Sequence, residues 1–587
     1  MPEATRETLI DALEQIATLL ELKGDNPFKI RAYRTGADTV RTFAGDFPAL
    51  ARNNELKGIK GIGDALRDKL HLLATTSSLP FLENLKAEFP ATIFELFEIS
   101  GLGAKKIALL YKELGVGSIA GLQAACESGE AAKLAGFGTK TATKLLEAIQ
   151  ARSVYATAFR MDQAAPAARE ILDYLRDHPA TSRAEVAGSF RRGSTTVHDL
   201  DFLVATKQPA AIMEAFVAPP WVESVIASGP TKTSVRLHSG VQCDLRAVTN
   251  AEFPFALAYF TGSKEHNIQL RARALKQGWT LNEYRFAPTG PDSPPVPEEI
   301  YEEAQIHRAL GLEFIEPALR EGNDEFHAAE TGTLPRLLEI ENLRGAFHNH
   351  TTASDGHASL REMAMAAMEL GMEYLGIADH SKSSFQAGGL DENRLRAQVA
   401  EIRKLNEEWA PDFQLLAGSE VDILKDGSLD FPDSLLAELD YVVASIHSVF
   451  NLPEAEMTAR IIRAVENPYV TMIGHLTGRL LLKREGYAID VPAILDACAA
   501  NGTIIELNAH PARLDMDWRW WRLAREKGVK CAINPDAHSI HGLQDLWYGV
   551  RSARKGWLTR DDVVNCLPLD QLFETLRAKR NRFAPKA

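Results

Sequence analysis

G-S-F-R-R-G-S-T-T-V-H-D-L-D, residues 188–201, is the stretch around which the first half of the chain is organised. It ends in Asp199 and Asp201, and side chains two apart on a strand point to the same face of a sheet. Both carboxylates would therefore face one site. Mg²⁺ binds carboxylate oxygens and completes its shell with water and substrate phosphates. The stretch predicts a metal and triphosphate site, with a solvated strand of alternating aspartates as the alternative.

The same stretch offers groups for the phosphates. The turn at Gly188 and Ser189 presents backbone N–H groups and a hydroxyl, and Arg191 and Arg192 add positive charge for the same anion. A later aspartate, Asp244, lies in an apolar strand, where a lone charge would be costly to bury. It is reasonable there only if it meets the other two aspartates at a metal that activates the attacking oxygen. Together these features predict nucleotidyl transfer.

Length and composition limit the class of protein to which the chain can belong. Its 587 residues are too many for one core and predict several domains. The net charge of −14 argues against a protein that coats DNA, but it does not exclude local basic faces that bind DNA. The five cysteines form no C-x-x-C pair, so we expect no disulfide framework and a cytoplasmic location. Neither a signal core nor an apolar run of about eighteen residues occurs, so no membrane span is expected.

Residues 6–150 carry helical patterns interrupted by three glycine-rich turns, at 58–63, 99–103 and 134–138. Each turn ends in Gly-apolar-Gly and precedes a helix-forming run, which is the helix-hairpin-helix pattern. The glycines let the backbone approach a phosphate, and the following helix offers free N–H groups. Such contacts grip the DNA backbone without reading its sequence. A tight turn between helices is the alternative for any single one. The predicted DNA-contacting residues are Gly58, Lys60, Gly61, Gly63, Lys69, Gly101, Gly103, Lys105, Lys106, Gly136, Gly138 and Lys140.

A third group of residues follows the aspartates. Tyr259-Phe260-Thr261-Gly262-Ser263 leads into a helix on which Asn267 and Arg271, four residues apart, share one face. The two aromatic residues could belong to the core or could wall off the sugar of a nucleotide. Taken in order, G-S-F-R-R-G, D-L-D, the later aspartate, Y-F-T-G-S and N-x-x-x-R resemble the family X DNA polymerases over about residues 5–320.

This resemblance implies roles for the residues. It implies that Asp199, Asp201 and Asp244 hold two Mg²⁺ or Mn²⁺ ions. It implies a nucleotide-binding set made of Gly188, Ser189, Arg192, Tyr259, Phe260, Gly262, Asn267 and Arg271. Two positions depart from the pattern. His198 stands where the family commonly has glycine, and Gln242 stands where some relatives have arginine, which puts rate and fidelity in question but not the reaction.

Lys69 lies where eukaryotic relatives with sugar-phosphate lyase activity have a lysine that forms a Schiff base. Lys60 and Arg67 would help to keep its amine neutral, whereas Asp64 and Asp68 would keep it protonated. Ala65 stands where those relatives have a further lysine. A simple contact with the DNA backbone is the favoured interpretation of Lys69, and lyase chemistry is the alternative.

The second half holds most of the histidines, and they follow short apolar strands that alternate with helical segments. This alternation predicts a parallel barrel with its site at the carboxyl ends of the strands. Imidazole with carboxylate, without thiolate, suits Zn²⁺, Mn²⁺ or Fe²⁺ at a hydrolytic centre. A histidine in a loop is usually only a polar surface residue, but nine positions at strand ends are not explained that way. They are His348, His350, Asp355, His380, Glu420, His447, His475, Asp536 and His538.

H-N-H-T-T-A-S-D-G, I-A-D-H-S, G-S-E-V-D, S-I-H-S, G-H-L-T-G-R and N-P-D-A-H resemble, in this order, the motifs of the PHP phosphoesterases. The resemblance implies a distorted (βα)₇ barrel in which the nine residues hold up to three metal ions. His357, His510 and His541 match no motif and are expected in the second shell or on the surface. Arg479 and Lys483 follow the His475 motif and could bind a substrate phosphate.

The predicted fold is multidomain, with all-α helix-hairpin-helix domains, an α+β palm and thumb, and an α/β barrel. The predicted ranges are a helical DNA-binding domain at 1–80, a fingers-type helix-hairpin-helix domain at 81–153, a nucleotidyltransferase palm at 154–250, a thumb-type nucleotide-selection domain at 251–320, a linker at 321–342 and a PHP domain at 343–575.

This combination is similar to bacterial and archaeal DNA-repair enzymes. It implies a gap-filling polymerase with a metal-dependent 3′-5′ exonuclease and abasic-site cleavage. The expected partners are gapped or nicked DNA and dNTPs, without a membrane, and the chain is expected to be a monomer. Two alternatives stay open. One is a nuclease or phosphatase whose polymerase half only holds DNA, and the other is a non-catalytic scaffold for DNA ends.

Overall fold

The computed structural model describes residues 6–43, 47–76, 78–99, 102–155 and 158–583. The chain divides into two compact units, residues 1–157 and 158–587. Each unit contains hydrophobic clusters of its own, so the chain is multidomain, as the sequence predicts. None of the described helices combines the length and the apolar composition needed to cross a bilayer.

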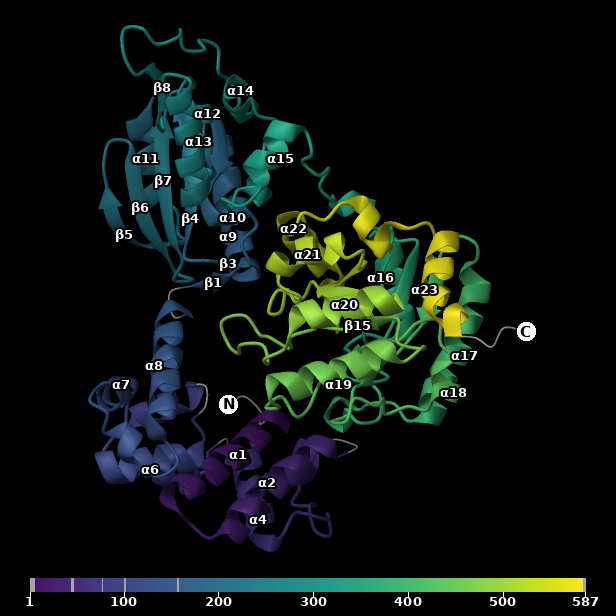
Figure 1. The fold of residues 1–587 in the computed structure, drawn as a ribbon. Coiled ribbons are helices and arrows are strands. Elements are labelled where there is room, and N and C mark those ends of the chain that lie inside the picture. Colours follow the sequence, from purple (N-terminus) through teal and green to yellow (C-terminus); the bar gives the residue numbers. More distant parts are fainter. Residues whose placement is uncertain (1–5, 44–46, 77, 100–101, 156–157, 584–587) are drawn as a thin grey trace. The chain divides into compact units, whose positions relative to one another are not determined.

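The first unit is helical throughout its described residues (Figure 1). On its first helix, Leu9, Leu13, Ile16 and Leu20 recur at helical spacing and are buried in one core. Its elements are α1 (Arg6–Lys23), α2 (Pro27–Thr42), α3 (Phe47–Arg52), α4 (Asp64–Thr76), α5 (Pro80–Ala87), α6 (Ala104–Leu114), α7 (Ile119–Glu127) and α8 (Gly138–Tyr155), with 3-10 turns at Ala91–Glu98 and Ala131–Lys133.

The second unit begins with a five-stranded sheet in the order β2-β4-β7-β6-β5. Its strands are β2 (Thr181–Val186), β4 (Asp199–Thr206), β5 (Val222–Ser228), β6 (Lys232–Leu237) and β7 (Gln242–Val248). Only β4 and β7 run parallel. Leu200, Phe202 and Val204 of β4 pack against α9 (Met161–Asp177) and α11 (Pro209–Val217). Leu203 and Ala205 pack on the opposite face with α12 (Phe253–Thr261), so the alternation of β4 assigns one face to each layer.

A smaller helical layer follows α12 and has its own core around Phe255, Leu270 and Phe326. The expected linker at 321–342 is not a bare connection, because it contains α15 (Glu325–Thr331), whose Phe326 is buried in this core. The other elements of this part are β1 (Phe159–Arg160), α10 (Gly188–Arg191), β3 (Thr196–Val197), α13 (Lys264–Lys276), β8 (Trp279–Leu281), β9 (Phe286–Pro288) and α14 (Glu303–Ala309), with 3-10 turns at Pro317–Leu319 and Ile340–Asn342.

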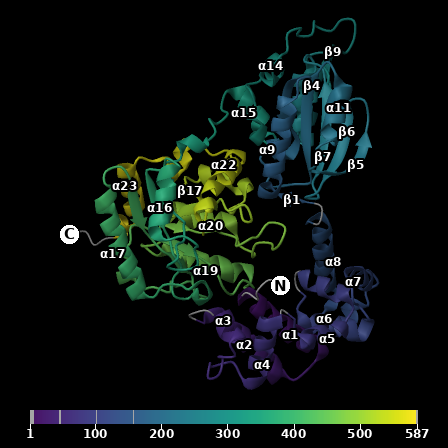
Figure 2. The ribbon, with the colours of Figure 1, turned by 180° about the vertical axis from the view of Figure 1, so that it is seen from behind.

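The rest of the second unit is a parallel barrel with helices on its outside (Figures 1 and 2). Its strands are β10 (Gly345–Ala346), β11 (Tyr374–Ile377), β12 (Gln414–Ala417), β13 (Glu420–Asp422), β14 (Val443–Ser445), β15 (Met472–Ile473), β16 (Ile504–Asn508) and β17 (Cys531–Asn534). Its helices are α16 (Leu360–Glu369), α17 (Glu392–Trp409), α18 (Asp433–Leu436), α19 (Glu454–Glu466), α20 (Val491–Asn501), α21 (Trp521–Glu526), α22 (Leu546–Lys555) and α23 (Leu569–Phe583).

The barrel closes through a parallel bridge between Asn349 and Ala537, which follow β10 and β17. On the other side, β12 pairs with β11 and β13 pairs with β14. These two short strands act as one strand broken at Gly418, where a Cβ would lie 2.4 Å from the Tyr441 ring. With that pair counted once, the eight strands make seven positions around the barrel. The irregularity places Glu420 at the start of β13, inside the barrel mouth.

Candidate metal centres and nucleic-acid interface

The first candidate centre is the carboxylate group on β4 and β7. Their parallel register places Asp201 opposite Asp244 and Asp199 opposite Gln242, and all three aspartates are half-buried on the face covered by α12. Burial raises the pKa of Asp201 to about 7, and repulsion from Asp199 and Asp244 adds to the effect. Burial, with repulsion from Asp244, also raises the pKa of Asp199. Carboxylates crowded in this way are the arrangement that a divalent cation relieves.

Lys232 is a charged neighbour of this group that the sequence analysis missed. Its Nζ lies 2.7 Å from Asp244 Oδ2, while Gln242 Nε2 donates to Asp244 Oδ1 at 3.0 Å. Burial opposes ionisation of Asp244, but hydrogen bonds from Lys232 and Gln242 lower its pKa overall. Lys232 is on β6, the neighbour of β7, and only the register between these strands brings it to the site.

The expected phosphate turn forms the short helix α10 directly after β2. Gly188 has a φ of +62°, and a Cβ there would lie 2.2 Å from Asp201 Oδ2. The Ala187 N–H donates to the Asp201 carbonyl at 2.7 Å. The turn therefore packs directly on one of the aspartates, and Ser189 lies beside it, half-buried. Glycine is required because no side chain fits between the turn and the carboxylate.

The two arginines of the turn have different surroundings. Arg191 is ion-paired with the buried Glu303, with Nη2 and Oε2 2.6 Å apart, and donates to Thr261 Oγ1 at 2.7 Å. Burial opposes ionisation of Glu303, yet Arg320 and Arg191 lower its pKa to about 2. The contacts of Arg191 therefore do not support the expectation that it adds charge for an anion, because its guanidinium is bound to Glu303 and Thr261. Arg192 directly follows α10 and donates from Nε to Glu321 Oε1 at 3.1 Å.

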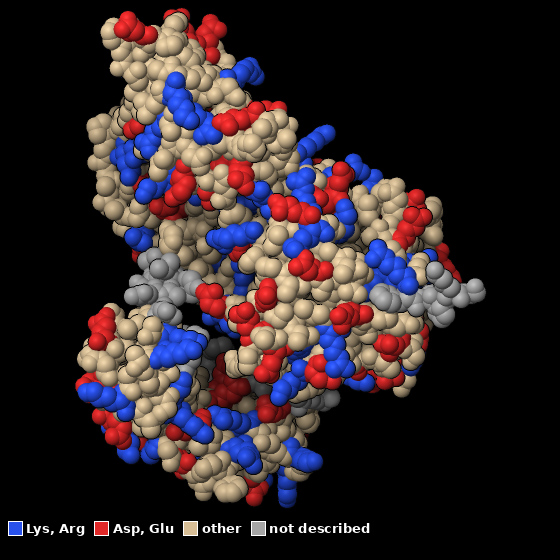
Figure 3. Space-filling view, in the orientation of Figure 1, with Lys and Arg blue, Asp and Glu red and all other residues tan. Residues whose placement is uncertain are grey.

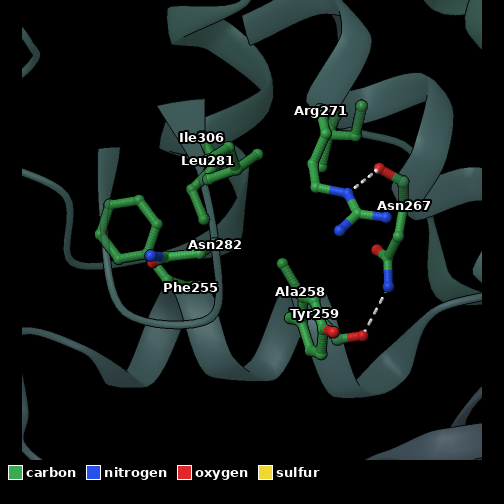
Figure 4. Close-up of a pocket in the computed structure, with 9 residues that line it drawn as sticks. Phe255, Ala258, Tyr259, Asn267, Arg271, Leu281, Asn282 and Ile306 are labelled. Carbon is green, nitrogen blue, oxygen red and sulfur yellow. Dashed lines mark hydrogen bonds between the residues drawn. The ribbon is translucent and has the colours of Figure 1, made fainter. Parts of the chain in front are cut away.

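The residues around Tyr259 line a small pocket, shown in Figure 4. Asn267 Nδ2 donates to the Tyr259 carbonyl at 2.7 Å, and Arg271 Nε donates to the Asn267 carbonyl at 3.3 Å. The Phe260 ring centre lies 5.1 Å from that of Tyr259, and the Arg246 guanidinium lies 4.3 Å from the Phe260 ring. Arg271 itself is exposed. The structure thus groups Tyr259, Asn267 and Arg271 at one pocket.

At the end of α12, Gly262 adopts a φ of +68° and is buried. A Cβ at this position would lie 3.3 Å from Arg192 Nη1. Arg192 Nη1 also donates to the Thr261 carbonyl at 2.6 Å. Gly262 and Arg192 therefore lie close together, although these two expected nucleotide-binding residues come from different motifs.

The glycine turns of the first unit share two features. In each, the apolar residue between the glycines is buried, as Ile62, Leu102 and Phe137 are, while the neighbouring described glycines are exposed. The next helix starts at once, since α4 begins at Asp64, Gly103 caps α6 and α8 begins at Gly138. This leaves backbone N–H groups at an exposed helix start, which suits a phosphate.

All described glycines of these turns that were predicted to contact DNA are exposed. Positive φ angles occur at Gly58, Gly61, Gly136 and Gly138, but not at Gly63 and Gly103. Lys60, Lys105 and Lys140 are exposed beside these turns, and Lys106 Nζ lies 5.8 Å from the Phe137 ring. Gly101, which the sequence analysis included, lies outside the described residues.

Lys69 lies on α4, where it donates to the Ala65 carbonyl at 3.3 Å and lies 4.8 Å from the Phe81 ring centre. The sequence analysis expected Asp64 and Asp68 to act on Lys69. In the structure both carboxylates contact Arg67, at 2.8 and 3.3 Å. The surroundings of Lys69 are therefore a backbone carbonyl and an aromatic ring.

The second candidate centre lies at the carboxyl ends of the barrel strands. Three groups of side chains bring ligand atoms within 4.8 Å of one another. They are His350 with Asp355, His380 and His538; His348 with His350 and Asp536; and His380 with Glu420 and His447. His475 joins them through Glu420, with Nε2 and Oε1 2.9 Å apart. The barrel thus gathers all nine residues that the sequence singled out.

Glu420 lies at the centre of this cluster. Its oxygens are 2.9 Å from His380 Nδ1 and 3.1 Å from His447 Nε2. Burial disfavours its charge, but His447, His348 and His380 hold the pKa of Glu420 well below its usual range. The same contact with Glu420 raises the pKa of His380 to about 10 and that of His447 to about 9, against the effect of burial.

The cluster fits a set of cations because some of its buried imidazole atoms face only other candidate ligands. His348 Nε2 and His350 Nδ1 are buried and make no hydrogen bond among the described residues. Burial and the neighbouring His380 lower the pKa of His350 to about 4, so its ring is neutral at physiological pH. Neutral imidazoles and ionised carboxylates are the ligand forms that Zn²⁺, Mn²⁺ and Fe²⁺ take.

A supporting layer orients the ligands, and the sequence analysis missed it. Glu506 on β16 accepts from His475 N and lies 2.7 Å from His348 Nδ1. Asp422 Oδ1 lies 2.9 Å from His447 Nδ1, and Arg513 Nε lies 3.4 Å from Asp536 Oδ2. Glu506 lies in the apolar strand I-I-E-L-N, and a carboxylate in an apolar strand is also the pattern that identified Asp244. Glu506 could therefore have been predicted from the sequence. Such partners fix the orientation of ligating rings.

The remaining basic and histidine side chains that were considered from the sequence are exposed or contact other residues. Arg479 is committed to Asp517 and to the Arg513 and Leu514 carbonyls, so the expectation that it binds a phosphate is not supported by its contacts. Lys483 is exposed. Among the histidines without a motif, His357 and His541 are exposed, and His510 Nδ1 accepts from Ala512 N at 3.2 Å.

Charge is mixed over the molecular surface. In Figure 3, lysine and arginine alternate with aspartate and glutamate over the face shown. The net charge of −14 is therefore not gathered into one acidic field on that face. An anion would therefore have to bind through local groups, such as the exposed helix starts at the glycine turns.

Comparison with known protein families matches four parts of the chain. Two helix-hairpin-helix models match residues 4–79 and 93–151, the second as a SAM-like tandem. The DNA polymerase beta thumb model matches residues 256–321, and the PHP domain model matches residues 346–510.

Similar proteins fall into two groups. The DNA polymerase/3′-5′ exonuclease PolX of Bacillus subtilis is 40% identical over 580 residues, covering 98% of this chain and 100% of that protein. A probable phosphatase of Thermoanaerobacter sp. is 29% identical over 40% of this chain and 95% of its own length. Another, from Acetivibrio thermocellus, is 31% identical over 32% of this chain and 78% of its own length.

Proposed function

Because the chain belongs to the PolX family of DNA polymerase/3′-5′ exonucleases, we propose that its two candidate centres divide these two reactions between them. The chain is a DNA polymerase with 3′-5′ exonuclease activity and acts on DNA with dNTPs. Its role is gap filling on gapped or nicked DNA in base-excision repair, as a cytoplasmic monomer. The proposed domain ranges are those predicted from the sequence, with α15 assigned to the thumb.

The polymerase centre is Asp199, Asp201 and Asp244. The observation that carries this proposal is the parallel pairing of β4 with β7, which faces Asp201 to Asp244. Mg²⁺ or Mn²⁺ bound there would activate the primer hydroxyl and stabilise the charge that develops on the phosphates. The N–H groups of the Gly188–Ser189 turn and the guanidinium of Arg192 hold the triphosphate.

The pocket near α12 selects the nucleotide. Tyr259 and Phe260 contact the sugar, while Asn267 and Arg271 contact the nucleotide and the template side. Tyr259, Asn267 and Arg271 line one pocket, and hydrogen bonds to the backbone orient the side chains of Asn267 and Arg271, which supports a common function for this group.

The exonuclease centre is the nine-residue cluster of the barrel. We assign it up to three ions of Zn²⁺, Mn²⁺ or Fe²⁺, which would supply an activated water and stabilise the phosphoryl transition state. Glu506 and Asp422 hold the ligating rings in place. Cleavage at abasic sites is a further proposed reaction of this centre, since it also breaks a phosphodiester bond.

The first unit grips DNA without reading its sequence. The exposed glycine turns, each opening a helix, and the lysines beside them support contacts with the phosphate backbone. Lys69 takes part in this grip.

Two variants test whether each centre catalyses one of the two reactions. Asp201→Ala is expected to abolish nucleotide addition on gapped DNA and leave 3′-end removal intact. His348→Ala is expected to lose bound metal, measured per chain by mass spectrometry, and the exonuclease, while gap filling persists. Loss of both reactions in a folded Asp201→Ala variant would exclude two independent centres, and no addition by the parent chain would leave the polymerase half as a DNA-binding platform.

A further inference from the structure

Helix α22 belongs to the barrel part of the second unit, yet it contacts the polymerase part. Its Trp547 and Tyr548 pack against the core of the five-stranded sheet. Arg551 donates to the Phe190 carbonyl of the phosphate turn, and its guanidinium lies 5.2 Å from the Phe190 ring. At Gly193, which closes the turn with a φ of +72°, a Cβ would lie 3.3 Å from the Arg551 carbonyl. Helix α22 of the barrel part therefore packs against the turn that follows β2.

The last residue of this helix, Lys555, is buried beside the same turn and only 2% exposed. Its ammonium is ion-paired with Glu321 Oε1 and lies 3.4 Å from the Arg192 carbonyl. Glu321 Oε1 also accepts from Arg192 Nε, at 3.1 Å. One carboxylate oxygen is thus shared by a cation from the phosphate turn and a cation from the barrel.

The exposed fractions show that this triad is largely removed from water. The side chains of Arg192 and Glu321 are 16% and 20% exposed. Burial opposes ionisation of Glu321, but Lys555 and Arg192 lower its pKa. Breaking a buried ion pair by removing one partner leaves an uncompensated charge and is costly.

We propose that Lys555 is a positioning residue of the polymerase, supplied by the barrel, which makes Arg192 available to the incoming triphosphate by sharing Glu321 with it. This inference rests on the proposed role of Arg192. A triphosphate that binds Arg192 competes with Glu321 for the guanidinium. With Lys555 in place, Glu321 keeps a partner when Arg192 turns to the phosphates. Without Lys555, the release of Arg192 would leave Glu321 buried and unpaired.

The test is the KM for dNTP in single-nucleotide gap filling by the full chain. Lys555→Met is expected to raise this KM about tenfold, the scale of one lost charge-assisted contact, with little change in kcat. Lys555→Arg, which keeps the cation, is expected to retain most of the parent KM. Arg554→Met, on the same helix but paired with Glu316 and Glu339, is the matched control and should leave the KM unchanged.

A second substitution separates positioning from packing. Lys555→Met combined with Glu321→Gln is expected to restore the KM, because no carboxylate then competes for Arg192. Glu321→Gln alone is expected to lower the KM below that of the parent, and this arm stands even if Lys555→Met does not fold. The rate of 3′-end removal should be the same in all these variants, since the cluster of the barrel is untouched.

An unchanged KM in folded Lys555→Met, a rise that Glu321→Gln does not relieve, or a raised KM in Glu321→Gln would each overturn the proposal. Arg192→Ala separates this inference from the function on which it rests. If Arg192→Ala leaves the KM for dNTP unchanged, the proposed triphosphate role of Arg192 fails. If Arg192→Ala raises the KM and Lys555→Met does not, only the role of Lys555 fails.

Discussion

Gly188 and Asp201 bring the turn that follows β2 into direct contact with the carboxylate group on β4 and β7. The absent side chain of Gly188 leaves room for Asp201 Oδ2, and the Ala187 N–H holds the Asp201 backbone from the same side. The positive φ of Gly188 would strain any other residue. At the scale of residues, the distance between this turn and the Asp201 carboxylate is therefore set by the lack of one Cβ.

Gly188→Ala is expected to reduce nucleotide addition about 100-fold, because displacement of reacting groups by about 1 Å costs this much. The strain should cost about 1–3 kcal/mol of stability. Single-turnover gap filling measures the first effect and thermal unfolding the second, with unchanged 3′-end removal as evidence of a folded barrel. Gly290→Ala is the control, because a Cβ there meets nothing within 4 Å. Full polymerase activity in Gly188→Ala would contradict this account.

The raised pKa of Asp201 predicts how metal binding responds to pH. Burial places this pKa at about 7 in the metal-free protein, so the carboxyl is mostly protonated at pH 6 and mostly ionised at pH 8. A divalent ion must displace the proton, so affinity rises with pH up to the folded pKa and then levels off. We expect Mg²⁺ affinity at the polymerase centre to rise about tenfold from pH 6 to pH 8.

Calorimetric titration of Mg²⁺ into His348→Ala, which is expected to bind less metal at the barrel cluster, measures this dependence mainly at the polymerase centre. Asp201→Asn in the same background should remove it, because the amide does not titrate in this range. Equal affinity of His348→Ala for Mg²⁺ at pH 6 and pH 8 would show that Asp201 is already ionised at the lower pH.

At the scale of elements, pairing decides which residues meet. The parallel register of β4 and β7 puts three carboxylates on one face, and a slip of β7 by one residue would turn Asp244 to the other face. In the barrel, the break between β12 and β13 lets Glu420 reach five histidines. In the first unit, the contacts of α4 assign Lys69 to a carbonyl and an aromatic ring.

These contacts of α4 predict that Lys69 grips DNA and forms no Schiff base. Borohydride treatment with a 5′-deoxyribose-phosphate substrate should therefore trap no adduct. Lys69→Ala should weaken binding to gapped DNA and reduce the slope of log K against log salt by about 0.9, the value for one phosphate contact. Fluorescence anisotropy across a salt series measures it. An adduct in the parent protein that is lost in Lys69→Ala would establish lyase chemistry.

Lys112→Ala is the matched control for this salt series. Lys112 is 82% exposed and lies in the last turn of α6, away from the glycine turn that opens this helix. We expect its removal to leave the salt slope unchanged. An equal loss of slope in both variants would indicate a general effect of charge and not a contact made by Lys69.

At the scale of the whole molecule, the two units have separate cores. The hydrophobic cluster of the first unit includes residues from Leu9 to Ile149, whereas the clusters of the second unit begin at Phe159. A unit with its own core can fold alone. We expect residues 158–587 to fold and to retain 3′-end removal on short oligonucleotides.

The same fragment should bind gapped DNA at least about tenfold more weakly than the full chain, because the phosphate contacts of the glycine turns are lost. Circular dichroism tests its folding, and anisotropy compares the two affinities at one salt concentration. Equal affinity would show that the first unit contributes nothing to DNA binding, which would contradict its proposed function.

The sequence alone was sufficient for the parts of this protein that depend on local pattern. Helix periodicity and repeated Gly-apolar-Gly turns predict the helical unit, because both are read within a few residues. Alternation of short apolar strands with helices predicts the barrel. Since a parallel barrel presents its strand ends on one face, the nine His, Asp and Glu positions could be predicted to converge, and the structure brings them together.

Tertiary structure alone decided the contacts between residues that are distant in sequence. Lys232 reaches Asp244 through strand register, Arg191 is ion-paired with Glu303 of another helix, and Arg479 contacts Asp517 and the Arg513 carbonyl. The pairing of Lys555 with Glu321 joins residues 234 positions apart. No periodicity encodes such pairs, because the energy of an ion pair depends on distance and burial, which exist only after the elements have packed.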